Sequence, residues 1–87
     1  HFVERQRIVR LLSAVIDHPQ KIGVGISERT AIIVHSDKFV VMGKGSVVVV
    51  DPTQADVTKG QKESLQSARR IRVDVLASGD RFDLEVP

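Results

Sequence analysis

The chain has 87 residues, of which 41% are hydrophobic and 28% are charged, so it can form a packed core and is not a disordered tail. It contains no cysteine, which excludes a disulfide scaffold, an iron–sulfur cluster and a Cys-based zinc finger. The net charge of +2 and the 3% of aromatic residues indicate neither a polyanion nor a single-stranded nucleic acid as partner. No apolar run approaches the roughly 20 residues that a membrane-spanning helix needs.

Residues 2–17 are predicted to form one amphipathic helix. The residues that fall within one arc of a helical wheel are Ile8, Leu12, Val15 and Ile16, with Val9 and Leu11 at its edges. The helix is expected to end near Asp17, because the next residue, His18, precedes a proline and is biased away from helical angles.

The segment 22–26, Ile-Gly-Val-Gly-Ile, is predicted to be a short strand buried on both faces, because it has no polar side chain. Gly23 and Gly25 lie on the same face of this strand. That spacing fits either a helix packed closely against them or the close approach of a ligand.

Three β-rich runs follow at 30–35, 38–42 and 46–50, and they predict an antiparallel meander. The last run holds four consecutive valines, which we expect to be covered on both faces. The polar stretch 52–68 is expected to be a mobile loop or a surface excursion. Alternating residues at 71–75 and 82–86, around a Ser-Gly-Asp turn, predict a half-exposed terminal β-hairpin.

The chain has no glycine-rich phosphate loop and no Gly-x-Ser-x-Gly nucleophile elbow. His18 and His35 are expected to be surface residues. His1, at the start of the chain, has two interpretations. It is either the remnant of a purification tag or a general base. The second interpretation rests on its position four residues before Arg5, which would place a base beside a carboxylate-binding group.

The predicted helix carries three arginines. Arg7 and Arg10 point away from its apolar arc and fit a solvated face. Arg5 lies near the middle of that arc, where a guanidinium needs an anion. Its partner is either a carboxylate of the same protein or one of a substrate.

These residues together resemble the C-terminal part of the cyanophycinases. The most specific motif is His-Phe-x-x-Arg-x-Arg-x-x-Arg-Leu at positions 1–11. Further matching motifs are Asp-His-Pro at 17–19, Gly-Val-Gly-Ile at 23–26, Gly-Lys-Gly-Ser-Val at 43–47 and the terminal segment 75–84. The resemblance covers nearly the whole chain apart from the polar stretch.

The resemblance implies a serine exopeptidase with a flavodoxin-like α/β fold that releases β-aspartyl-arginine dipeptides from cyanophycin (multi-L-arginyl-poly-L-aspartate). It places the catalytic histidine at His1 and substrate-binding arginines at Arg5, Arg7 and Arg10. It implies that the nucleophile serine lies outside this chain and that the enzyme uses no metal or cofactor. It also implies a homodimer in the cytoplasm, with a secreted form left open. Residues 1–87 are then the C-terminal part of a single α/β peptidase domain, and the N-terminal part of the same enzyme is its partner.

Two alternatives stay open at this point. One is a β- or α-aspartyl dipeptidase of the same family, and the other is a non-catalytic binding module on that fold. The chain also departs from the family pattern at Ser27, where cyanophycinases usually have aspartate. Because the chain begins with His1 and not Met, we expect a fragment or a processed chain.

Overall fold

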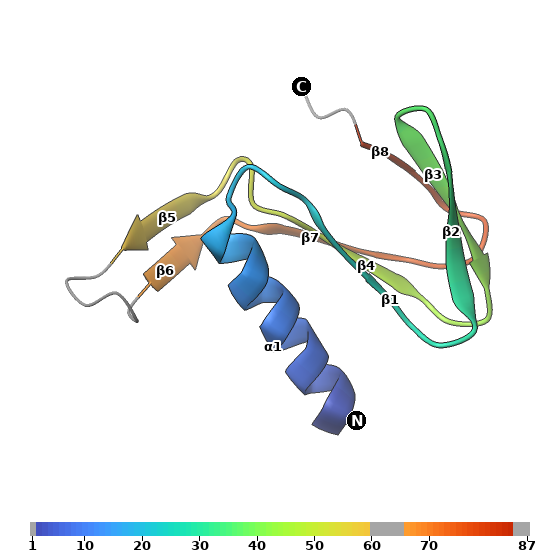
Figure 1. The fold of residues 1–87 in the computed structure, drawn as a ribbon, viewed down its shortest axis with the longest axis horizontal. Helices are drawn as coiled ribbons and strands as arrows, with labels where there is room; N and C mark the ends of the chain where they lie inside the picture. The colour runs from blue at the N-terminus through green and yellow to red at the C-terminus, as the bar shows by residue number, and fades with distance from the viewer. Residues whose placement is uncertain (1, 60–65, 85–87) are drawn as a thin grey trace. The chain divides into compact units, whose positions relative to one another are not determined.

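The fold is described by a computed structural model that covers residues 2–59 and 66–84, with side chains for 6–58 and 67–84. In this part of the chain, one helix is followed by short strands (Figure 1). The elements are α1 (Phe2–Asp17), β1 (Gly23–Ile26), β2 (Thr30–His35), β3 (Lys38–Gly43), β4 (Val47–Asp51), β5 (Asp56–Lys59), β6 (Gln66–Arg69), β7 (Arg72–Leu76) and β8 (Arg81–Asp83). The predicted α/β class, a helix followed by antiparallel strands, is confirmed.

The helix α1 has the bounds that the sequence predicted. It ends at Asp17, and the His18 amide donates to the Val15 carbonyl at 3.0 Å. Val15 is buried, but Ile8, which the wheel places in the same arc, is 43% exposed. Only part of the predicted apolar face of the helix is therefore buried in the described chain.

Gly23 on β1 marks the place where the helix and the strand pack closely. A Cβ at this position would come within 2.5 Å of Val15 Cγ2 and 2.9 Å of Leu11 Cδ1. Of the two explanations for this glycine, close packing of a helix is therefore confirmed. The strand itself is not buried as predicted, because it lies at the edge of its sheet and Ile26 is exposed.

The strands form two three-stranded sheets, with orders β1-β4-β7 and β2-β3-β8, and the ribbon β5-β6. By its internal contacts the chain divides into two compact units. The first comprises residues within 1–24 and 49–73, and the second comprises residues within 25–48 and 74–87.

The core of the first unit is formed by Val15, Val49, Val50 and Pro52. The valine run of β4 is covered on both faces, as predicted, because Val49 on one face and Val50 on the other are both buried. As the central strand of its sheet, β4 also has a neighbour along each edge. The strand ends at Asp51, whose buried carboxylate accepts hydrogen bonds from the amide and the hydroxyl of Thr53, at 2.9 and 2.5 Å. This buried charge is thus satisfied within a local turn.

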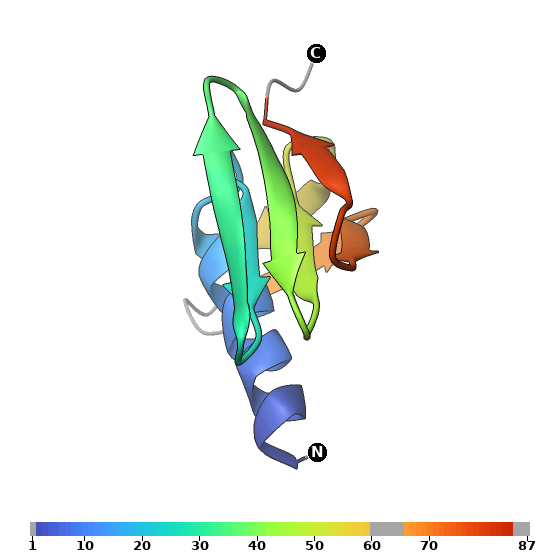
Figure 2. The ribbon, with the colours of Figure 1, turned by 90° about the vertical axis from the view of Figure 1, so that its right-hand side faces the viewer.

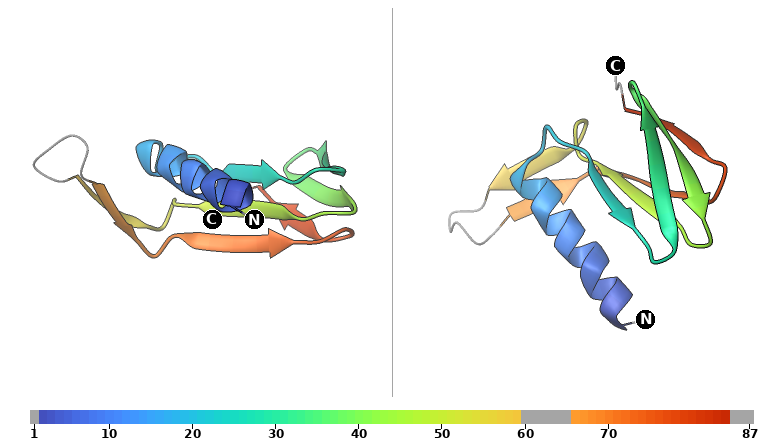
Figure 3. Two further views of the ribbon diagram at one scale, coloured as in Figure 1. Left: turned by 90° about the horizontal axis from the view of Figure 1, so that it is seen from below. Right: turned by 45° about the vertical axis from the view of Figure 1, so that its right-hand side comes forward.

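The stretch 52–68, predicted to be a mobile loop or a surface excursion, contains β5 and most of β6. The two strands run side by side as a ribbon (Figure 3). They pair antiparallel, with Val57 opposite Ala68. An ion pair between Arg70 Nη2 and Asp56 Oδ2 closes the base of this ribbon. Cross-strand pairing satisfies backbone groups that a loop would leave to water, and the polar composition concealed this.

The second unit is built on β3, with β2 on one side and β8 on the other (Figure 2). Ser36, with a positive φ of 58°, forms the predicted tight turn between β2 and β3. Phe39 lies opposite Phe82 across β3 and β8, and their rings stack with centroids 5.4 Å apart.

Two predicted strand pairings are wrong. β4 does not continue the meander beside β3, and β7 and β8 do not form a hairpin, because each pair lies in different sheets. At the predicted turn around Gly79, the chain bonds to β3 and not across a hairpin: Gly79 N donates to Val41 O at 2.8 Å, and Val41 N donates to Asp80 O at 2.9 Å. The turn itself is present, with φ 93° at Gly79.

Candidate functional site

The predicted site begins with His1, which lies outside the described residues. The backbone of Arg5 belongs to α1, and its side chain also lies outside what the structure describes. The catalytic role of His1 and the choice of anion for Arg5 therefore remain predictions.

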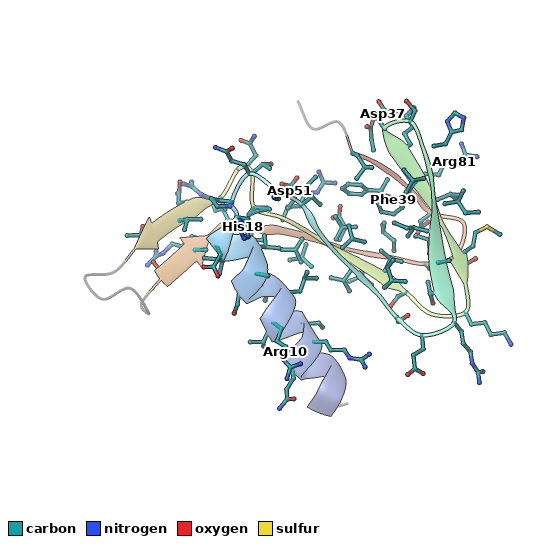
Figure 4. The ribbon with its side chains drawn as sticks, viewed as in Figure 1. Arg10, His18, Asp37, Phe39, Asp51 and Arg81 are labelled. Carbon is teal, nitrogen blue, oxygen red and sulfur yellow. The ribbon has the colours of Figure 1, made fainter. Side chains whose placement is uncertain are left out.

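Arg7 and Arg10 are both exposed on α1, and neither has a hydrogen bond or an ion pair within the described part of the chain. Figure 4 labels Arg10 on this helix. At 100° per residue they lie about 60° apart around the helix axis, whereas Arg5 lies on the other side. The helix thus brings Arg7 and Arg10 to one face. A guanidinium group has a fork geometry that suits a carboxylate, so this face could bind an anion.

The unit that contains α1 is also the basic part of the chain. Its two sequence segments hold nine Lys and Arg residues and five Asp and Glu residues. Such an excess of positive charge attracts an anionic ligand electrostatically over long range, and salt would weaken this attraction by screening.

His18 and His35 are exposed, as predicted. The carbonyl of His18 accepts the Lys21 amide at 2.9 Å in the turn after α1, so its backbone has a structural role. Among the described residues, no group of three or more His, Cys, Asp or Glu could hold a metal ion. No helix of this part of the chain is long and apolar enough to span a membrane.

The densest side-chain hydrogen bonding lies elsewhere, in a group that we call the hydroxyl clamp and define as Ser27, Thr30, Gly45 and Ser46. Ser27 Oγ donates to Ser46 O at 2.8 Å and accepts from Ser46 N at 2.8 Å. Thr30 Oγ1 donates to Glu28 O at 3.0 Å and accepts from Gly45 N at 2.9 Å. The clamp joins the turn before β2 to the loop before β4.

The sequence singled out Ser27 only as a departure from the family pattern, and it placed Thr30 at the start of a predicted strand without a role in the site. The signals were present, since Ser27 and Thr30 flank a short turn and Gly-x-Gly breaks the chain at 43–45. Nothing in the sequence indicates that two segments 15 to 19 positions apart share hydrogen bonds, because this depends on the course of β2 and β3.

Curated proteins similar to this chain include several cyanophycinases. A cyanophycinase of Trichormus variabilis is 43% identical over 89 residues, which cover 97% of this chain and 30% of that protein. The chain is a relative of the cyanophycinases. The predicted resemblance is thereby confirmed.

Two further relatives agree with this. The cyanophycinase of Geminocystis herdmanii is 36% identical over 95% of the chain, and that of Synechococcus elongatus is 38% identical over 97%. The chain spans 32% and 27% of their lengths, so it matches a segment of each cyanophycinase. No family model matches the chain.

Proposed function

We propose that this chain is the C-terminal segment of a cyanophycinase-like serine exopeptidase, a hydrolase that converts cyanophycin to β-aspartyl-arginine dipeptides. The observation that carries the proposal is the identity of 36–43% with cyanophycinases over nearly the whole chain, together with the histidine–arginine motif at positions 1–11.

In this proposal His1 is the general base. A serine from the N-terminal part of the enzyme attacks the scissile carbonyl, and His1 takes the hydroxyl proton and later gives it to the leaving amine. Histidine suits both steps near neutral pH. Water then hydrolyses the acyl-enzyme by the same proton transfers in the second half of the reaction.

The arginines Arg5, Arg7 and Arg10 bind substrate carboxylates. Each cyanophycin side chain ends in an arginine whose α-carboxylate is free, and a guanidinium can bind such a group through two parallel hydrogen bonds. The exposure of Arg7 and Arg10, without a partner among the described residues, supports this assignment. A helix that carries the base and the arginines would hold both on one rigid element.

The proposal is tested on the intact enzyme that contains this segment. Wild-type protein is incubated with cyanophycin, and the released β-aspartyl-arginine is quantified. Replacement of the base, His1→Ala, is expected to lower kcat on the order of 10⁴-fold, as the loss of a triad member does in serine peptidases. The matched control is His35→Ala, because His35 is exposed at the end of β2, and we expect wild-type rates from it.

Three results would contradict the proposal in different ways. Hydrolysis of α- or β-aspartyl dipeptides but not of cyanophycin would favour the dipeptidase alternative. Binding without hydrolysis would favour the binding module. A mild effect of His1→Ala would remove His1 from the mechanism. We further propose a cytoplasmic homodimer, which fractionation of cells and light scattering of the intact enzyme can test.

A further inference from the structure

Only one half of the helix α1 is packed against its unit in the described chain. The side chains at 6–10 are all exposed. Burial begins at Leu11 and Leu12, which are half-buried, and is deepest at Val15, which is 5% exposed. The packing that holds the helix in the described chain therefore comes from its C-terminal half.

The groups assigned to catalysis and substrate binding belong to the other half. His1 directly precedes the helix, and the three arginines lie within the first nine of its residues, up to Arg10. A helix rises about 1.5 Å per residue, so Arg10 and Arg5 lie roughly 8 and 15 Å along the axis from Val15. Because a helix is rigid, a displacement at Val15 would also displace these groups.

Gly23 on β1 faces this packed half of the helix. A Cβ on Gly23 would lie 2.5 Å from Val15 Cγ2 and 2.9 Å from Leu11 Cδ1. Two carbon atoms in ordinary contact are about 3.5–4.0 Å apart, so a methyl group here would require a displacement of about 1 Å. Gly23 is not among the glycines with a positive φ. The helix contact, and not the backbone angle, therefore disfavours a side chain at this position.

The helix is the part that such a methyl group would displace. Val15 is β-branched, so it has one strongly preferred rotamer in a helix, and its burial leaves it little room. On the opposite side of the contact, β1 is paired with β4, the central strand of its sheet. The added methyl group would therefore push α1 away from β1.

We propose that Gly23 is a positioning residue of the peptidase. Because it has no side chain, it sets the distance between α1 and β1 at which His1 and the arginines of the helix meet the substrate. The inference rests on the proposed function and deepens it. A misplacement of reacting groups by about 1 Å can lower a rate on the order of 10²-fold, even when the substitution lies far from the chemistry.

The test is an exchange of side-chain size across this contact in the intact enzyme. Gly23→Ala adds a methyl group on the strand, Val15→Ala removes two from the helix, and the double variant does both. We expect Gly23→Ala to lower kcat/KM on cyanophycin on the order of tenfold or more. Val15→Ala alone should stay within about threefold of wild type, and the double variant should recover to within about threefold.

Melting temperatures separate positioning from a loss of stability. Val15→Ala leaves a cavity, so it should melt below wild type although its kinetics change little. The control variant Phe82→Leu reduces the core of the other unit, where Phe82 stacks on Phe39. It should also melt at a lower temperature and keep kcat/KM within about twofold of wild type. Kinetics are measured well below all melting temperatures.

A crystal structure of the Gly23→Ala enzyme measures the displacement directly. We expect α1 to move by about 1 Å relative to β1, and to return towards its wild-type position in the double variant. If Gly23→Ala does not fold, Val15→Ile replaces it, because this change adds a methyl group to the same contact from the helix side. Wild-type kinetics of Val15→Ile would then overturn the positioning role.

The outcomes separate this inference from the proposed function. Release of dipeptide from cyanophycin by the wild type tests the function alone, and an enzyme that cleaves aspartyl dipeptides instead is assayed with that substrate. The positioning role is overturned if Gly23→Ala keeps wild-type kcat/KM, if the double variant is as slow as Gly23→Ala, or if α1 does not move. Inactivity of the wild type on both substrates overturns both proposals.

Discussion

Two glycines of this fold adopt backbone angles that other residues rarely adopt. Gly43 has a φ of 122° and Gly79 a φ of 93°, which are values that side chains disfavour. They differ in their surroundings, because a Cβ on Gly43 would meet Arg29 O and Thr30 Cα, whereas nothing lies within 4 Å of a Cβ on Gly79. A substitution at Gly79 therefore tests backbone strain alone, whereas one at Gly43 tests backbone strain together with steric contact.

We predict that Gly43→Ala destabilises the protein more than Gly79→Ala does. Both changes add the strain of a positive φ, of order 1–3 kcal/mol, but only Gly43→Ala forces backbone atoms apart. Denaturant unfolding of the two variants and the wild type measures the difference. Equal losses would show that the loop at Gly43 moves aside without cost.

Arg5 offers a second residue-scale prediction. If its anion is the substrate, Arg5→Lys should reduce kcat/KM by about 1–3 kcal/mol of transition-state stabilisation, because lysine keeps the charge but loses the planar fork. If the anion is internal, the melting temperature falls and the kinetics change only indirectly. Thermal melts and kinetics on one purified variant decide between these outcomes.

At the scale of elements, β4 holds most of the fully buried side chains among the described residues. Val47 and Val50 are completely buried, and they lie on opposite faces of the strand. Its neighbours are β1 and β7, so residues distant in sequence meet on one aliphatic strand.

We predict that Val50→Ala lowers the free energy of unfolding by about 1–3 kcal/mol, from lost apolar burial and the cavity left behind. Val48→Ala in the same strand should cost less, because Val48 is only half-buried. Urea unfolding of both variants checks the order. A larger loss at Val48 would mean that the intact protein buries this position more deeply.

At the scale of the whole molecule, the described chain leaves large apolar side chains exposed on several elements. Val75 on β7 is 68% exposed and Val9 on α1 is 60% exposed, and further examples lie on β1, β2 and β3. The resemblance implies that residues 1–87 are the C-terminal part of a larger α/β domain, and such exposure is what an incomplete core leaves. The relatives, about three times as long, are consistent with this.

We accordingly predict that the isolated 87-residue chain releases no dipeptide from cyanophycin and unfolds without a cooperative transition. The intact enzyme, in contrast, should release dipeptide and unfold cooperatively. The reasons are the absent nucleophile elbow and the uncovered apolar surface. Dipeptide release and hydrogen exchange on the two proteins provide the measurements. Activity of the isolated chain above background would refute the assignment of the nucleophile to another segment.

Local signals in the sequence determined most of the elements, although not β5 and β6. The bounds of α1, the valine strand, the tight turn at Ser36 and the turn at Gly79 all follow from periodicity and from turn chemistry, which act over a few residues. The resemblance to the cyanophycinases likewise came from short motifs, and the comparisons confirmed it.

Only the tertiary structure decided which strands pair. β4 joins β1 and β7, β8 joins β3, and the polar stretch folds into β5 and β6. The hydroxyl clamp was also invisible in the sequence, since its partners lie 15 to 19 positions apart. The physical reason is that strand edges offer equivalent hydrogen-bonding groups to any neighbour, so side-chain packing across the whole fold, such as Phe39 against Phe82, selects the partner.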